Sequence, residues 1–272
     1  MRYRSLILAA GLLAGVALAG AVAAAPALPP LPSYTVQTAH TPPVIDGKLD
    51  EPIWAFTPEF KLVDCATGAP SHELTRVKMV WHGAYLYLGA LVYEKDLQDH
   101  SQRHGDLVFS ESCLEIYLEA PASLPTQEAP WRYLEIDVSP TGVMYDARVT
   151  NWRLRHPDPA VKYPFEGDDS YYPPDLKVAT RVIGTLNDNR DQDKGWWVEM
   201  QIPLTGAPRG WPPCLLEGNN RQQWRFNVYR VHNWTKPDQE LQAFSPTGIL
   251  GFHVAPRFAY LRFADMPYWP FP

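Results

Sequence analysis

Short segments in which apolar and polar residues alternate follow one another along this chain, and no segment beyond residue 27 shows a long helical period. Alternation with period two is typical of strands with one buried face, because successive side chains of a strand point to opposite sides. Turn-forming residues separate these segments, as at Asp46-Gly47 and Pro140-Thr141-Gly142. About nine strands are expected after an extended start at 34–39, namely residues 75–81, 85–93, 113–118, 133–138, 143–150, 176–183, 196–202, 224–231 and 258–263.

This spacing predicts an all-β fold, a single antiparallel β-sandwich of the jelly-roll kind. The composition agrees, because 12% of the 272 residues are aromatic and 28 are proline, which favours strands and turns over helices. No internal repeat and no second core is visible, so one domain is expected over residues 44–265. Residues 152–174 are expected to form a long loop and residues 266–272 a C-terminal tail.

The first 27 residues have the features of a secretory signal peptide. Arg2 and Arg4 precede an apolar run from Leu6 to about Leu18, and small residues follow. Cleavage after Ala23 or after Ala27 fits the small-residue pattern. We therefore expect a secreted or periplasmic protein with no membrane segment after cleavage, and a proline-rich linker over residues 28–43.

The chain is acidic, with 24 Lys and Arg against 30 Asp and Glu and a formal charge of −6. Nucleic-acid-binding proteins need a basic surface, so a nucleic-acid partner is not expected. We expect a monomer. The three cysteines, Cys65, Cys113 and Cys214, allow at most one internal disulfide, whose pairing stays open, and none stands in a CxxC or zinc-type spacing.

Several predicted strands have one apolar face and one face with carboxylates, amides, arginine and aromatic rings. Period two places Glu115 with Tyr117, and Glu135 with Asp137. Such a face is either a solvated outer surface or a concave platform for a polar ligand. Sugars suit the second alternative, because aromatic rings stack on their C–H faces and polar side chains hydrogen-bond their hydroxyl groups. Two further strands show this pattern, with Glu199 beside Trp197 and Gln201, and with Arg225, Asn227 and Tyr229 on one face.

The sequence has no GxSxG, HExxH, P-loop or GxGxxG motif. A glycoside hydrolase would need two carboxylates across a cleft, and Glu115, Glu135, Asp137 or Glu199 could supply them. Carboxylates on a strand face are more often structural, so we expect no enzyme.

Two alternatives involve cofactors. Four oxygen-bearing residues at alternate positions resemble a calcium loop that lacks the usual final glutamate, or else simply form a polar hairpin loop over 187–195. They are Asn187, Asn189, Asp191 and Asp193. A histidine with a methionine could instead ligate haem, as in an electron-transfer module. The candidates are His82, His232 and His253 with Met79, Met144 and Met200.

Several segments resemble family 9 carbohydrate-binding modules, in particular the divergent bacterial branch. They are the opening PVIDGKLDEPIW at 43–54, TRVKMVW at 75–81, ESCLEIYL at 111–118, YLEID at 133–137, WRFN at 224–227 and the closing residues from 253 to 263. The resemblance covers roughly residues 34 to 265.

The resemblance implies a non-catalytic β-sandwich that binds a poly- or oligosaccharide and serves carbohydrate catabolism, with calcium bound structurally in well-studied members. Those members hold the sugar between two tryptophans, and the matching positions fall near Phe109 and Phe252. Glu135 falls near a basic residue that contacts the sugar in those members, so the ligand set is not intact. The expected binding residues are Phe109, Glu111, Glu115, Glu135, Asn227, Arg230 and Phe252. A distant relative of the fold binds haem, which leaves that alternative open.

Overall fold

The computed structural model describes residues 28–120, 131–151, 165–168, 173, 175–204, 224–233, 237 and 239–267. The expected signal peptide, Cys214 and most of the predicted 152–174 loop lie outside these residues. Among the described residues, no helix is both long enough and apolar enough to span a bilayer.

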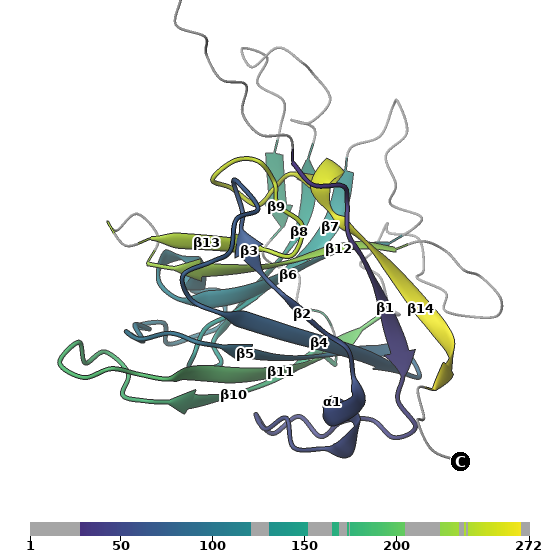
Figure 1. Cartoon of the computed structure of the whole chain (residues 1–272), viewed down its shortest axis with the longest axis horizontal. Coiled ribbons are helices and arrows are strands. Elements are labelled where there is room, and N and C mark those ends of the chain that lie inside the picture. Colours follow the sequence, from purple (N-terminus) through teal and green to yellow (C-terminus); the bar gives the residue numbers. More distant parts are fainter. Residues whose placement is uncertain are drawn as a thin grey trace, which may run out of the picture.

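One continuous β-sheet curls into two facing layers (Figure 1). The first layer consists of β10 (Lys177–Ile183), β11 (Gly195–Pro203), β5 (Tyr85–Val92) and β4 (Thr75–His82), in that order. The second consists of β12 (Trp224–His232), β6 (Cys113–Glu119), β7 (Trp131–Val138), β8 (Met144–Asn151) and β9 (Phe165–Asp168). Between β4 and β12, β1 (Ser33–Thr38) and β14 (Ala259–Pro267) join the two layers along one side. The predicted all-β sandwich is confirmed.

Smaller elements complete the sheet. The strand β2 (Glu59–Lys61) pairs with β4, and β3 (Val63–Asp64) pairs with β13 (Glu240–Ala243), which extends β12. One helix, α1 (Pro52–Phe56), and two short 3₁₀ helices, η1 (Val108–Ser110) and η4 (Ala255–Arg257), are also present in the described residues. The alternation did not predict β2, β3 or β13, because two to four residues show no usable period, and it assigned β9 to a loop.

The main core fills the space between the layers. Alternate residues of β6, such as Leu114 and Ile116, point inward and belong to one apolar cluster with Val198 and Met200 of β11. Burial of this surface at about 25 cal/mol per Å² is the main stabilising contribution to such a fold. Because each strand turns one set of alternate residues into this core, the other set of β6, β7 and β12 must face outward.

The first strand departs from the antiparallel prediction. The strand β1 runs parallel to both β14 and β4. It lies inside residues 28–43, where the prolines predicted a linker, yet its Tyr34 and Val36 are buried in the main core. The Tyr34 hydroxyl also donates a 2.6 Å hydrogen bond to the Pro58 carbonyl, so this segment is part of the sheet.

The opening Asp46-Gly47 turn wraps around the carboxylate of Glu199. Backbone N–H groups of Asp46, Gly47 and Lys48 donate to Glu199 Oε2 at 3.0, 2.9 and 3.2 Å. Trp54 Nε1 donates to Oε1 at 3.2 Å. Gly47 has a φ of +81°, and a Cβ there would meet the Thr180 carbonyl oxygen at 2.9 Å, so the turn requires glycine. Glu199 therefore has a structural role.

Candidate functional site

The outward face of β6, β7 and β12 is covered by residues 249–258, here called the covering segment. Tyr229 donates from its hydroxyl to the Phe252 carbonyl at 2.9 Å, and Asn151 Nδ2 donates to the His253 carbonyl at 3.2 Å. A second apolar cluster forms beneath it, including Tyr117, Tyr133 and Phe258. The sheet therefore fixes the position of the covering segment by hydrogen bonds as well as by packing.

A pocket of about 210 Å³ opens where the covering segment and η1 leave this face uncovered. Its walls come from η1, β6, β7, β12 and the covering segment. The lining residues are Phe109, Glu115, Tyr117, Glu135, Val231, Gly251, Phe252 and His253. The structure thus brings together four of the residues that the sequence analysis predicted to bind a sugar. They are Phe109, Glu115, Glu135 and Phe252.

Two phenyl rings form the aromatic walls of this pocket. Phe252 is only 7% exposed, because its ring stacks on Tyr229 with centroids 4.2 Å apart and planes 11° apart. Phe109 is more exposed and meets the Tyr145 ring edge-on at 5.8 Å. Close to these rings in the sequence are three exposed apolar residues. Leu107 directly precedes η1, and Ile249 and Leu250 begin the covering segment. The pocket therefore has one rigid ring and one more accessible ring.

The pocket floor is acidic. In the β6–β7 register, Glu115 lies opposite Asp137 and Tyr117 lies opposite Glu135. Oxygen atoms of the three carboxylates all lie within 4.8 Å of one another. Tyr117 donates to Glu135 Oε1 at 3.0 Å and the Cys113 thiol donates to Glu115 Oε1 at 3.4 Å. Glu115 Oε2 and both oxygens of Asp137 have no hydrogen-bond partner within the described part of the chain.

Burial dominates the protonation of these groups. Loss of hydration raises the pKa of Glu115 to about 7. Burial, followed by repulsion from Glu115, raises the pKa of Glu135 to about 8. Burial and then repulsion from Glu115 and Glu135 raise the pKa of Asp137 well above its usual range. The three groups favour their neutral forms, since each charge would be desolvated and close to another negative charge.

Three predicted binding residues lie away from this pocket. Glu111 accepts from the His100 backbone N–H at 2.7 Å and pairs with His100 Nδ1 at 2.8 Å. Asn227 shares the outward face, but its Nδ2 donates to the Ser245 carbonyl at 2.8 Å and its Oδ1 accepts from the Ser245 N–H at 2.9 Å. Arg230 lies on the opposite face of β12. None of the three lines the pocket.

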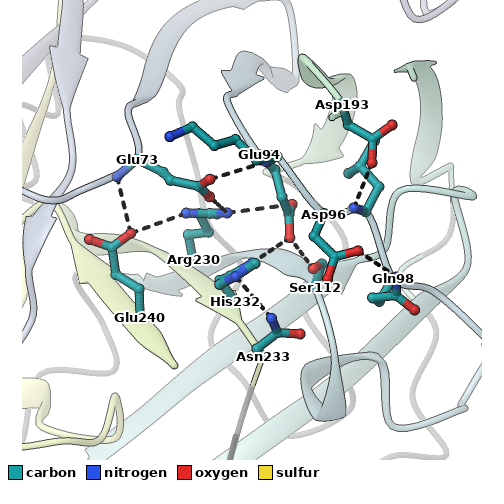
Figure 2. Close-up of polar contacts among 12 residues, drawn as sticks. Glu73, Glu94, Asp96, Gln98, Ser112, Asp193, Arg230, His232, Asn233 and Glu240 are labelled. Atoms are coloured by element: carbon teal, nitrogen blue, oxygen red, sulfur yellow. Dashed lines mark hydrogen bonds and ion pairs between the residues drawn. The ribbon is translucent and has the colours of Figure 1, made fainter. Parts of the chain in front are cut away.

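Arg230 is the centre of a buried charge network at one end of the sandwich (Figure 2). Its side chain is 0% exposed and pairs with Glu73 at 2.8 Å, Glu94 at 3.5 Å and Glu240 at 3.5 Å. His232 Nδ1 lies 2.6 Å from Glu94 Oε1. Burial alone would raise the pKa of Glu94, but the charges of Arg230 and His232 lower it overall. This network lies beside a second hollow of about 480 Å³, lined by His72, Glu73, Lys95, Asp96, His232, Pro237, Gln239 and Glu240.

Two residues of the predicted calcium loop, the buried Asp193 and the exposed Asn187, use their side chains for hydrogen bonds to the backbone. Asp193 accepts from the N–H groups of Leu97 at 2.8 Å and Thr185 at 2.6 Å. Asn187 Oδ1 accepts from the Asp99 N–H at 2.9 Å, and its Nδ2 donates to the Asp99 carbonyl at 2.8 Å. Asn189 and Asp191 are exposed. Two of the four residues therefore hold the 187–193 loop against residues 95–99 by hydrogen bonds.

The haem candidates lie in separate environments. His82 pairs with the Ala39 carbonyl at 2.8 Å, His232 lies in the Arg230 network, and His253 pairs with the Tyr133 hydroxyl at 2.9 Å. Met79 and Met200 are buried in the main core. The free thiols Cys65 and Cys113 are also buried, and burial raises the pKa of Cys65 to about 11. Their low exposure makes both thiols poor nucleophiles or metal ligands.

Sequence reasoning missed Val231, Gly251 and His253 as pocket residues. The covering segment has no period that would show which side chains turn toward the sheet. Tyr117 could have been named, since the alternation of β6 places it on the face of Glu115.

No family model and no curated protein matches this sequence. Solved structures match it by fold. A candidate carbohydrate-binding protein from Bacteroides uniformis ATCC 8492 has a TM-score of 0.61 at 14% identity, covering 86% of this chain and 100% of that chain. A family 9 carbohydrate-binding module from Caldicellulosiruptor kristjanssonii has TM-scores of 0.55 in its glucose complex and 0.53 in its cellotriose complex. Both have 15% identity and cover 88% of this chain and 100% of that chain. The chain therefore has a fold like that of family 9 carbohydrate-binding modules.

Proposed function

We propose that this chain is an exported, monomeric, non-catalytic protein that binds one sugar unit of an oligo- or polysaccharide in the pocket lined by Phe109 and Phe252, in the service of carbohydrate catabolism. The proposal rests on one observation. Two phenyl rings and two carboxyl groups line the same pocket on the outward face of the sheet. The same fold holds glucose and cellotriose in the Caldicellulosiruptor kristjanssonii module.

The chemistry of the pocket suits a pyranose. A phenyl face packs against the C–H groups of a sugar ring, and carboxyl oxygens accept hydrogen bonds from sugar hydroxyls. At about 210 Å³ the pocket is smaller than the roughly 300–1,000 Å³ of sites for drug-sized ligands, which favours a single sugar unit. The exposed Leu107, Ile249 and Leu250 on the two loops would extend the apolar surface toward neighbouring units.

The protonation of the floor supports a binding role over hydrolysis. A glycosidase needs one carboxyl that is protonated and one that is ionised, so their environments must move the two pKa values apart. Here burial moves the pKa values of Glu115, Glu135 and Asp137 in the same direction, upward.

Isothermal titration calorimetry across a panel of glucose, cello-, xylo- and manno-oligosaccharides tests the proposal. We expect heat with at least one member and weaker binding of that sugar in Phe109→Ala. The matched control is Phe56→Ala, which removes an exposed ring on α1, far along the chain from the pocket loops. No heat with any sugar would refute saccharide binding, and release of reducing sugar by the purified chain would refute the non-catalytic role.

A further inference from the structure

We propose that Glu115, Glu135 and Asp137 form a binding site for one hard divalent cation, of the Ca²⁺ class, at the floor of the pocket. This site goes beyond saccharide binding and does not depend on it. It also differs from the loop of Asn187 to Asp193 that the sequence suggested for calcium.

The spacing of the oxygens fits one ion. Glu115 and Asp137 are cross-strand neighbours, and Glu135 precedes Asp137 by two residues on the same face of β7. Oxygens from all three lie within 4.8 Å of one another. Calcium–oxygen bonds of about 2.3–2.6 Å place two ligands on opposite sides of the ion roughly 4.6–5.2 Å apart. A cation among these oxygens would need little movement of the sheet.

The state of Asp137 is a second observation that points to a ligand. Its side chain is 0% exposed, and neither of its oxygens has a hydrogen-bond partner in the described part of the chain. Glu115 Oε2 lacks a partner as well. Folded proteins leave few buried polar atoms unsatisfied, because each costs free energy. A bound cation would satisfy all three atoms.

The other buried acids of this face and of the network have a cationic neighbour. Glu119, on the same face of β6, lies opposite Arg225, whose charge partly offsets the effect of burial on the pKa of Glu119, although both Glu119 oxygens lack a hydrogen-bond partner among the described residues. Glu94 pairs with Arg230 and His232. No ion pair with Lys, Arg or His involves Glu115, Glu135 or Asp137 among the described residues. The three-carboxylate cluster therefore brings three acids together with no basic side chain facing them among the described residues.

The ligand atoms favour a hard ion. Carboxylate oxygens prefer Ca²⁺, Mg²⁺ or Mn²⁺, whereas thiolates prefer softer metals. The nearby Cys113 thiol donates a 3.4 Å hydrogen bond to Glu115 Oε1, so the three carboxylates alone make up the cluster. Glu115 and Glu135 line the open pocket, which gives an ion a route from solvent and leaves a coordination position facing Phe109 and Phe252.

Calorimetric titration of CaCl₂ into chelator-treated, sugar-free protein at pH 8 tests the site, with MgCl₂ and MnCl₂ in parallel. We expect one bound ion per chain, a higher melting temperature, and loss of binding in the Glu115→Gln, Asp137→Asn double variant. Glu119→Gln is the matched control, since it removes a buried carboxylate from the same face of β6 without touching the cluster. Asp191→Asn tests the loop, and both controls should bind as the original chain does.

Absence of binding to the original chain would overturn the site, as would loss of binding in Asp191→Asn with retention in the double variant. If the double variant fails to fold, Glu135→Gln alone, checked by circular dichroism, provides the comparison. Stabilisation by glucosamine but by no metal ion would also overturn it, because the cluster would then recognise an ammonium group. Since the metal titrations contain no sugar, their outcome is separate from that of the glycan panel.

Discussion

Glu115 on β6 lies directly opposite Asp137 on β7, with both side chains buried on the same face of the sheet. Like charges at directly opposed positions destabilise an antiparallel pair, and burial makes the repulsion stronger. The neighbouring pair on β6 and β12 has the usual arrangement, because Glu119 lies opposite Arg225. The Glu115–Asp137 pair can persist only with protons or with a cation.

Removal of one acid should therefore stabilise the cation-free protein. At pH 8 in the presence of a chelator, Asp137→Asn should raise the free energy of unfolding by about 1–3 kcal/mol, because an amide replaces a buried, unsatisfied carboxyl group. Urea denaturation measures the change. In excess CaCl₂ the sign should reverse, since the original chain alone gains stability from the bound ion.

The control for that prediction is the same pair of measurements on Glu119→Gln. Its stability difference from the original chain should be the same with and without CaCl₂. A calcium-dependent difference in Glu119→Gln, or an equal effect of Asp137→Asn in both conditions, would contradict the assignment.

The pH dependence of stability should follow the raised pKa values. Burial, partly offset by the charge of Arg225, raises the pKa of Glu119 from 4.5 to about 8. The folded protein then binds more protons than the unfolded chain between about pH 4.5 and 8, so this group lowers the free energy of unfolding as pH rises through that window. In Glu119→Gln the free energy of unfolding should fall less between pH 4.5 and 8, by up to a few kcal/mol, because glutamine does not titrate. Thermal melts at pH 5 and pH 8 test this, and an unchanged slope would be the contrary result.

The alternation of residues was enough to predict the layers and the acidic face. The expected segments at 113–118 and 133–138 match β6 and β7 closely, and the same period puts Glu115, Glu135 and Asp137 on one side. Arg230 illustrates the use of the two-residue period. It lies three residues after Asn227, so the two side chains must point to opposite faces of β12. The family resemblance nevertheless listed both as sugar-binding residues. The covering segment was not predictable, because its path over the sheet depends on tertiary contacts such as the Tyr229–Phe252 stack.

The Arg230 network should be strongly coupled. Arg230→Met would leave Glu94 buried without its main counter-charge, and we expect a loss of about 3–5 kcal/mol in the free energy of unfolding. Glu94→Leu, combined with Arg230→Met, should lose less than the sum of the two single changes, because the double variant has no orphaned charge at that pair. A double-variant cycle by urea denaturation measures the coupling, and strict additivity would contradict it.

Phe109 is the sharper test of sugar stacking. Phe252 packs on Tyr229, so Phe252→Ala should lower stability as well as affinity, whereas Phe109 is more exposed and should tolerate change. Loss of one aromatic stack worth about 0.5–1.5 kcal/mol predicts a roughly 2- to 10-fold weaker affinity in Phe109→Ala. Phe109→Leu keeps apolar bulk without the ring and should lose nearly as much, while Phe109→Trp should bind more tightly through its larger ring. Calorimetry with the best sugar of the panel gives the ranking, and equal affinities for the leucine and phenylalanine forms would exclude a stacking role for this ring.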